Sequence, residues 1–207
     1  MATKNRNPAY DGTTLSGAHI GDNAHASLVG RGDADWLFIS AHALEAVSGT
    51  WTASYASNVP ISTRTSAAAT EVATFNLEAL RAQDPKFRQA RVKALKLAYS
   101  VDTADLTNLL IELVSINAPG NGSIPVGAVV AGDADADYDA AHNTAAKRGL
   151  DTAAPEEHTL LMTIPSSDRV RIDGNDGMVA RLTATDPGTS DLLVKGLWVQ
   201  LDHIDGA

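Results

Sequence analysis

The chain has no cysteine, few aromatic residues and a deficit of basic side chains. Without a thiol among its 207 residues, it forms neither a disulfide nor a thiolate metal site. Aromatic residues make up 5% of the sequence, so few large rings are available for a core or a binding surface. The net charge of -9 argues against direct contact with nucleic acid, because such proteins neutralise phosphates with clustered lysine and arginine.

Long apolar runs and catalytic motifs are also missing. No run of 18 apolar residues is present, so we expect no transmembrane helix and no membrane partner. The opening MATKNRNPAYDG lacks the apolar stretch of a secretion signal. There is no GxSxG elbow, P-loop or dinucleotide-binding glycine motif, and the histidines show no metal-ligand spacing. We therefore expect no enzyme, no catalytic residue and no cofactor.

What the sequence does contain is alternation of apolar and polar residues. Residues 91–116 predict a hairpin of two strands joined by the turn DTAD, with Leu95, Leu97, Tyr99, Val101, Leu109, Ile111 and Leu113 on its apolar faces. Because two strands alone are marginal in water, a second layer is needed, and strands at 158–164, 178–184 and 192–204 can supply it. In the last strand the alternation places Leu193, Leu197, Val199 and Leu201 on one face and Val194, Trp198 and Ile204 on the other.

These patterns predict a mainly β fold, an antiparallel β-sandwich of jelly-roll-like type with an extended N-terminal arm. The arm spans 1–35, where polar residues and glycines interrupt any periodicity. Residues 36–70 are interpreted as a small β element followed by a linker around Pro60. The sandwich domain spans 71–207 and includes a long loop at 117–157.

The long loop carries four carboxylates at alternate positions: Asp133, Asp135, Asp137 and Asp139. Such a ladder offers the hard oxygen ligands that Ca²⁺ prefers. The EF-hand pattern fails, however, because Tyr138 stands where that loop needs glycine and Thr144 where it needs a bidentate acid. A solvated acidic turn is the favoured interpretation, so no metal is predicted and Ca²⁺ binding stays an alternative.

Four blocks, LAYSVDTADLTNLLIELVSI, DADYDAAHNTAAKRG, EEHTLLMTIP and LLVKGLWVQLD, occur in this order between about residues 95 and 204. Over this region the chain resembles a group of structural proteins encoded in phage genomes. The family's YD-x-x-H-x-T-A-A-x-R segment is matched by Tyr138, Asp139, His142, Thr144, Ala145, Ala146 and Arg148, and its E-H-T strand by Glu157, His158 and Thr159. The resemblance implies a virion component with a jelly-roll-like β-sandwich and no active site.

The expected function is therefore that of a structural component of a phage virion, in a capsid, decoration or tail-associated role. It would be assembled in the host cytoplasm as a homo-oligomer, with copies of itself and other virion proteins as partners. Since aromatic and arginine side chains dominate interface energetics, the predicted contact residues are Trp36, Phe38, Trp51, Tyr55, Tyr138, His142 and Arg148. The alternative is a carbohydrate- or receptor-binding β-sandwich module, which requires exposed aromatic side chains that form a platform.

Overall fold

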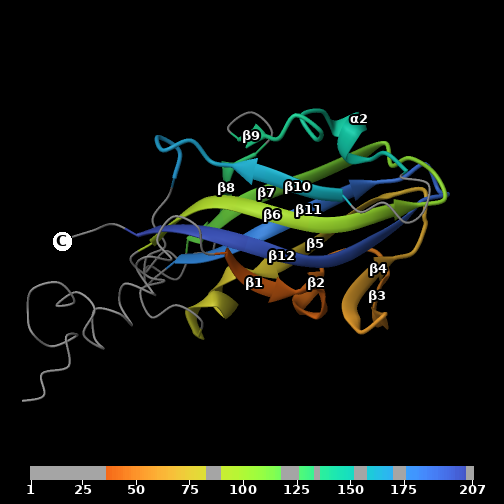
Figure 1. The fold of residues 1–207 in the computed structure, drawn as a ribbon, viewed down its shortest axis with the longest axis horizontal. Helices are drawn as coiled ribbons and strands as arrows, with labels where there is room; N and C mark the ends of the chain where they lie inside the picture. The colour runs from red at the N-terminus through yellow and green to blue at the C-terminus, as the bar shows by residue number, and fades with distance from the viewer. Residues whose placement is uncertain are drawn as a thin grey trace, which may run out of the picture. The chain divides into compact units, whose positions relative to one another are not determined.

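The alternating segments form strands in two antiparallel sheets that pack face to face (Figure 1). The computed structural model describes residues 36–82, 90–117, 126–132, 136–151, 158–169 and 176–203. The seven-stranded sheet has the order β3 (Trp51–Ala56), β4 (Val59–Arg64), β12 (Asp191–His203), β6 (Ala90–Asp102), β10 (His158–Thr163) and β9 (Asp137–Tyr138), and β1 (Trp36–Ser40) also pairs with β12. This confirms the predicted mainly β, antiparallel sandwich.

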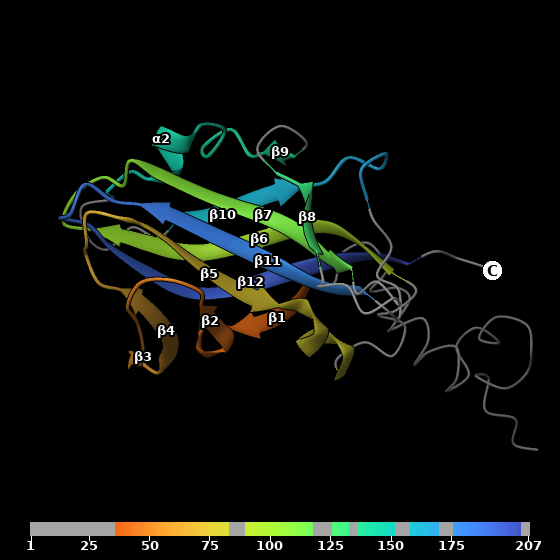
Figure 2. The same cartoon turned by 180° about the vertical axis from the view of Figure 1, so that it is seen from behind.

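The five-stranded sheet, which Figure 2 brings to the front, has the order β2 (Leu44–Ala46), β5 (Thr70–Asn76), β11 (Asp176–Thr185), β7 (Asn108–Asn117) and β8 (Val126–Ala131). Helical segments are short: the 3-10 turns η3 (Ala41–Ala43) and η4 (Leu77–Ala82) and the helix α2 (Ala145–Arg148). Within the described ranges, no helix has the length and apolarity that crossing a membrane requires.

The core lies between the two sheets and is built from alternate residues of facing strands. Leu95, Leu97 and Tyr99 of β6 and Leu109 and Leu113 of β7 are each 0% exposed. Burial of a side chain of this size contributes about 1.5–3 kcal/mol. The predicted inward positions of both strands are confirmed.

The predicted hairpin at 91–116 is wrong, because its two strands belong to different sheets. β6 pairs with β12 and β10, whereas β7 pairs with β11 and β8. The intervening turn, in which Thr103 has φ 82, carries the chain from one sheet to the other. β6 and β7 therefore face each other from opposite sheets of the sandwich. Alternation identifies a buried face but not whether the next strand lies beside it or across the core.

Residues 36–70 are part of the sandwich, which corrects the predicted linker and the division at residue 70. Trp36–Ala207 forms one unit, in which β4 pairs with β12 and β2 with β5. The polar residues that suggested a linker make turns instead: Ser57 and Asn58, with φ 48 and 68, form the two-residue connection between β3 and β4. The predicted arm at 1–35 lies outside the described residues.

A β-bulge in the final strand decides which side chains face outward. The register of β12 against β6 shifts between Val194 and Gly196, so the strand gains one residue there. Leu192 and Val194 face the core before the bulge, and Leu197, Val199 and Leu201 face it afterwards. The prediction that placed Leu193 on the same face as Leu197 is therefore wrong. Trp198 lies on the opposite face from Leu197 and points away from the core.

Candidate functional site

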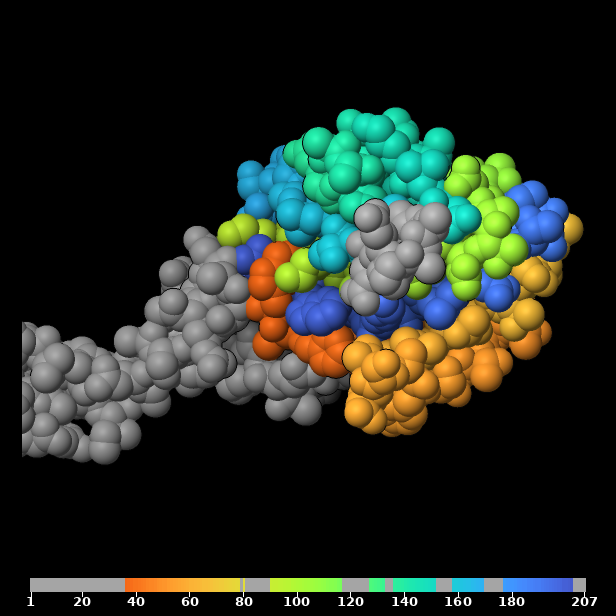
Figure 3. Space-filling model, turned by 45° about the vertical axis from the view of Figure 1, so that its right-hand side comes forward, coloured from red at the N-terminus to blue at the C-terminus, as the bar shows by residue number. Residues whose placement is uncertain are grey.

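Aromatic and basic side chains gather on the outer surface of the seven-stranded sheet. Residues that face each other in antiparallel strands point to the same side, so the register places Phe38, Trp198 and Lys96 in one row across β1, β12 and β6. Trp36 lies two residues from Phe38 on the same side of β1. Figure 3 shows β1, in red-orange, beside the blue β12 at the surface. We call these four residues the aromatic face.

The rings of the aromatic face are held by one another and by a lysine ammonium. The ring centroids of Phe38 and Trp198 lie 4.8 Å apart at an interplanar angle of 44°. The Nζ of Lys96 lies 4.5 Å from the ring centroid of Trp36 and 5.6 Å from that of Trp198, within the range of cation–π attraction. Phe38 is 38% exposed and the two indoles are half-buried. The surface is therefore both ordered and open to solvent.

The phenyl ring of Phe38 packs directly against Gly196, the glycine of the β12 bulge. A Cβ atom at Gly196 would lie 2.4 Å from Cε2 of Phe38, closer than any carbon contact allows. The absence of a side chain at this position lets the phenyl ring lie against the strand. The bulge thus both turns Trp198 outward and leaves room for the neighbouring ring.

Of the seven predicted contact residues, two lie on the aromatic face and two more lie elsewhere near the surface. Trp36 and Phe38 are on the aromatic face. Trp51 is half-buried against the core and its Nε1 donates to the Ser48 carbonyl at 3.2 Å. Tyr55 is 70% exposed on β3. Lys96 and Trp198 were not among the predicted contact residues, although both occupy outward positions of alternating strands.

The other three predicted contact residues meet in a buried cluster with Asp139 and His158. A carboxylate oxygen of Asp139 lies 2.8 Å from Nδ1 of His142. The Nε2 of His142 lies 3.0 Å from Nδ1 of His158, whose Nε2 lies 3.0 Å from the Leu150 carbonyl. His142 is 6% exposed and His158 9%. Asp139, His142 and His158 thus form a chain of hydrogen bonds that links the turn after β9 to β10.

Arg148 closes this cluster from the other side and is 1% exposed. Its Nε donates to the Leu109 carbonyl at 2.7 Å and its Nη1 to the His142 carbonyl at 3.1 Å. The guanidinium also lies 4.4 Å above the ring centroid of Tyr138. Because Arg148 and His142 are buried, the prediction that they contact another subunit is wrong. Tyr138 is half-buried and donates its hydroxyl to the Ile111 carbonyl at 3.1 Å.

Both histidine rings are engaged in hydrogen bonds at each end of the pair. The Leu150 carbonyl and the Asp139 carboxylate only accept hydrogen bonds, so the Nε2 of His158 and the Nδ1 of His142 donate to them. Burial works to raise the pKa of Asp139, but hydrogen bonds from the Leu161 N–H, His142 and the Ala141 N–H outweigh it and lower that pKa. Every ring nitrogen is engaged. This cluster attaches residues 136–151 to the sheet.

The alternative Ca²⁺ site, a ladder of alternate aspartates, is not assembled by the residues that the structure describes. Asp133 and Asp135 lie outside them, and Asp137 is exposed. The Asp139 carboxylate is hydrogen-bonded to the His142 ring and accepts hydrogen bonds from the N–H groups of Ala141 and Leu161. Over the described ranges, no three acidic or imidazole side chains come together in a metal-binding arrangement.

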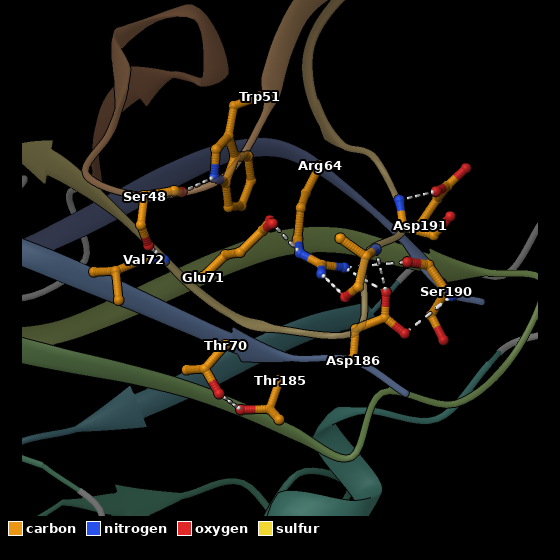
Figure 4. Close-up of polar contacts among 12 residues, drawn as sticks. Ser48, Trp51, Arg64, Thr70, Glu71, Val72, Thr185, Asp186, Ser190 and Asp191 are labelled. Carbon is orange, nitrogen blue, oxygen red and sulfur yellow. Dashed lines mark hydrogen bonds and ion pairs between the residues drawn. The ribbon is translucent and has the colours of Figure 1, made fainter. Parts of the chain in front are cut away.

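A second buried polar cluster surrounds Arg64 at one end of the sandwich (Figure 4). The guanidinium is 0% exposed; its Nη1 donates to the Asp186 carboxylate at 2.8 Å and its Nη2 to the Ala67 carbonyl at 2.9 Å. Its Nε lies 2.7 Å from a carboxylate oxygen of Glu71, an ion pair without an aligned hydrogen bond. Arg64 belongs to one sheet and Glu71 to the other, so the cluster ties the sheets together. No sequence pattern indicates this cluster, because Arg64 falls in the segment interpreted as a linker.

Asp186 makes the stability of the fold decrease at low pH. Burial works to raise its pKa, but hydrogen bonds from Arg64 and from the N–H groups of Gly188, Ser190 and Thr189 lower it from 3.8 to about 2. A depressed carboxyl pKa stabilises the fold at higher pH, and about 2 kcal/mol is lost as the pH falls from about 5 towards 2. Urea unfolding across this range should show the loss. Asp186→Asn should reduce the pH dependence of the free energy of unfolding, and the smaller dependence that remains would come from Asp139. If the variant keeps the full pH dependence, Asp186 is not its main source.

No family model matches the chain, and no curated protein does. Among solved structures, the chain is similar to a carbohydrate esterase from a Shiga toxin-encoding bacteriophage, with 16% identity over 77% of this chain and 90% of that one and a TM-score of 0.38. It is also similar to a family 11 carbohydrate-binding module of a Clostridium thermocellum cellulase, with 8% identity over 83% and 91% and a TM-score of 0.35. A family 30 carbohydrate-binding module gives 9% identity over 82% and 84% and a TM-score of 0.39. None of these likenesses assigns a role to a residue of this chain.

Proposed function

We propose that the chain is a carbohydrate-binding β-sandwich module whose ligand lies on the aromatic face. The observation that carries the proposal is the set of three partly exposed rings, Trp36, Phe38 and Trp198, on adjacent strands around Lys96. The face of an aromatic ring is electronegative, so it attracts the polarised C–H groups on the flat side of a pyranose. A cluster of such rings on a sheet is a ready stacking surface for a sugar.

The neighbouring rows supply polar groups beside the rings. Ser40 on β1 and Thr159 and Thr163 on β10 occupy outward positions in the rows that flank Lys96. Their hydroxyls both donate and accept, which suits the hydroxyl groups of a sugar. All of these residues lie on strands, so little ordering entropy would be lost when a ligand binds.

Replacing Trp198 with alanine is expected to weaken glycan binding about 30-fold, because truncation of a central aromatic side chain commonly costs 2 kcal/mol or more. The test is a glycan array for the wild-type chain, followed by calorimetric titration of the strongest oligosaccharide into both proteins. The matched control is Tyr55→Ala, which removes an aromatic side chain that is 70% exposed on β3, outside the aromatic face. It should keep wild-type affinity.

Two results would contradict the proposal. One is an array on which the wild-type chain binds no glycan. The other is a Trp198→Ala variant that keeps its fold by circular dichroism and also keeps full affinity. Equal losses in Trp198→Ala and Tyr55→Ala would place the binding surface somewhere other than the aromatic face.

A second candidate, the virion structural role implied by the phage resemblance, is favoured by the exposed edge of β3. This strand pairs only with β4 among the described strands, and its sequence WTASYA has neither a charge nor a proline to block further pairing. In this proposal copies of the chain pair through β3. Light scattering during size exclusion should detect an oligomer that Tyr55→Ala weakens and Trp198→Ala does not. A wild-type monomer at all concentrations would contradict this pairing.

A further inference from the structure

We propose that the aromatic face selects anionic sugars, with the ammonium of Lys96 as the group that recognises the negative charge. This inference rests on the proposed glycan binding and names the class of ligand. Its basis is the position of a cation that no described carboxylate pairs with, in the middle of a stacking surface, on a chain with a net charge of -9.

Lys96 has no carboxylate partner within the described part of the chain. Its row neighbours are Trp198 on β12 and Leu161 on β10, neither of which is charged. The ion pairs formed by the described residues do not include Lys96, and neither do their hydrogen bonds. An ammonium carries three N–H donors, which two ring faces attract but do not satisfy as acceptors.

Two acidic residues that the structure describes on this outer surface lie farther from Lys96 or are already paired. Asp137 is two strands from Lys96 and two residues along, which is on the order of 10 Å. Asp202 lies four residues beyond Trp198 on β12 and accepts a hydrogen bond from Arg169 at 3.0 Å. At physiological salt the screening length is about 8 Å, so these two carboxylates offset the lysine charge only weakly.

The position of Lys96 on the aromatic face fits a sugar that carries an acidic group better than it fits a neutral sugar. A pyranose stacked on Phe38 and Trp198 would place a ring substituent next to the Nζ of Lys96, because that atom lies 5.6 Å from the Trp198 centroid. A carboxylate or sulfate there would accept charge-assisted hydrogen bonds, which are about twice as strong as neutral ones. A neutral hydroxyl would leave the ammonium without a counter-charge.

The test uses an array of neutral, uronate-containing and sulfated oligosaccharides, followed by titration with polygalacturonate and its methyl ester and with dextran sulfate and dextran. We expect the hits to be acidic sugars, with carboxylate and sulfate probes distinguishing the two sources of charge. Lys96→Met should weaken binding to the acidic probe about tenfold more than it weakens binding to the neutral counterpart, because both probes lose the cation–π contacts but only the acidic probe loses the counter-charge. Binding to the acidic probe should also weaken as salt is raised.

The control is Lys147→Met, which removes the same charge from α2, where the Nζ is bonded to the Ala140 carbonyl at 3.1 Å. Figure 1 shows α2 and β1 at opposite sides of the sandwich. This variant should bind the acidic probe like wild type. Neutral hits, or equal losses in the two lysine variants, would overturn the selectivity and leave glycan binding intact. No hit on the array would overturn the proposed function as well.

Discussion

Arg64→Met is expected to lower the free energy of unfolding by about 3–5 kcal/mol, which for a domain of ordinary stability is a large part of the total. The substitution removes the only cation that the described structure pairs with Glu71 and Asp186, whose side chains are 7% and 0% exposed. Two carboxylates would then remain buried without a counter-charge. Equilibrium unfolding in urea, monitored by circular dichroism, measures the loss.

The matched control for this result is Arg181→Met, since Arg181 also forms an ion pair across strands but is 36% exposed. Exposed pairs contribute about 0–1 kcal/mol, so this variant should remain close to wild type. Adding Glu71→Gln and Asp186→Asn to Arg64→Met should recover part of the stability, because the buried charges are removed. A fully stable Arg64→Met would contradict the role of the cluster.

Arg148→Met is expected to cost about 3 kcal/mol or more and to release the segment 136–151 first. The variant leaves the carbonyls of Leu109 and His142 without the donor that the buried guanidinium provides and uncovers the ring of Tyr138. Local opening should appear as new proteolytic cleavage within 136–151 under native conditions, together with a lower denaturation midpoint.

The adjacent residue provides the control for this variant. Lys147 is exposed on the same helix, so Lys147→Met should cost less than about 1 kcal/mol and leave the cleavage pattern unchanged. If Arg148→Met unfolds cooperatively at the wild-type midpoint with no new cleavage, the buried cluster is not what attaches this segment.

The sequence was sufficient to predict the kind of fold, because a strand with one buried face shows alternating apolar and polar residues over a few positions. Residues such as Leu97 and Ile111 were identified as core from their neighbours alone, and both are buried. The same local signal could not tell which strands share a sheet. For that reason the stretch 91–116 was predicted as a hairpin, and Arg64 was assigned to a linker although it lies at the centre of a buried ion cluster.

Motif spacing placed Tyr138, His142 and Arg148 in one segment, but it could not show that His142 and Arg148 are buried. Aromatic and arginine side chains occur both in interfaces and in polar clusters of the interior, and only burial separates the two. Here the tertiary structure gives each of them a partner within the same chain.

By itself, the sequence determined the mainly β class, the inward residues of β6 and β7 and the absence of thiol chemistry, since each depends only on residue type and local period. Only the tertiary structure decided the aromatic face. Trp36, Lys96 and Trp198 are far apart in the chain and come together through the pairing of β1, β12 and β6. That pairing also depends on a bulge at Gly196, and a one-residue shift in register reverses every later side chain on the strand.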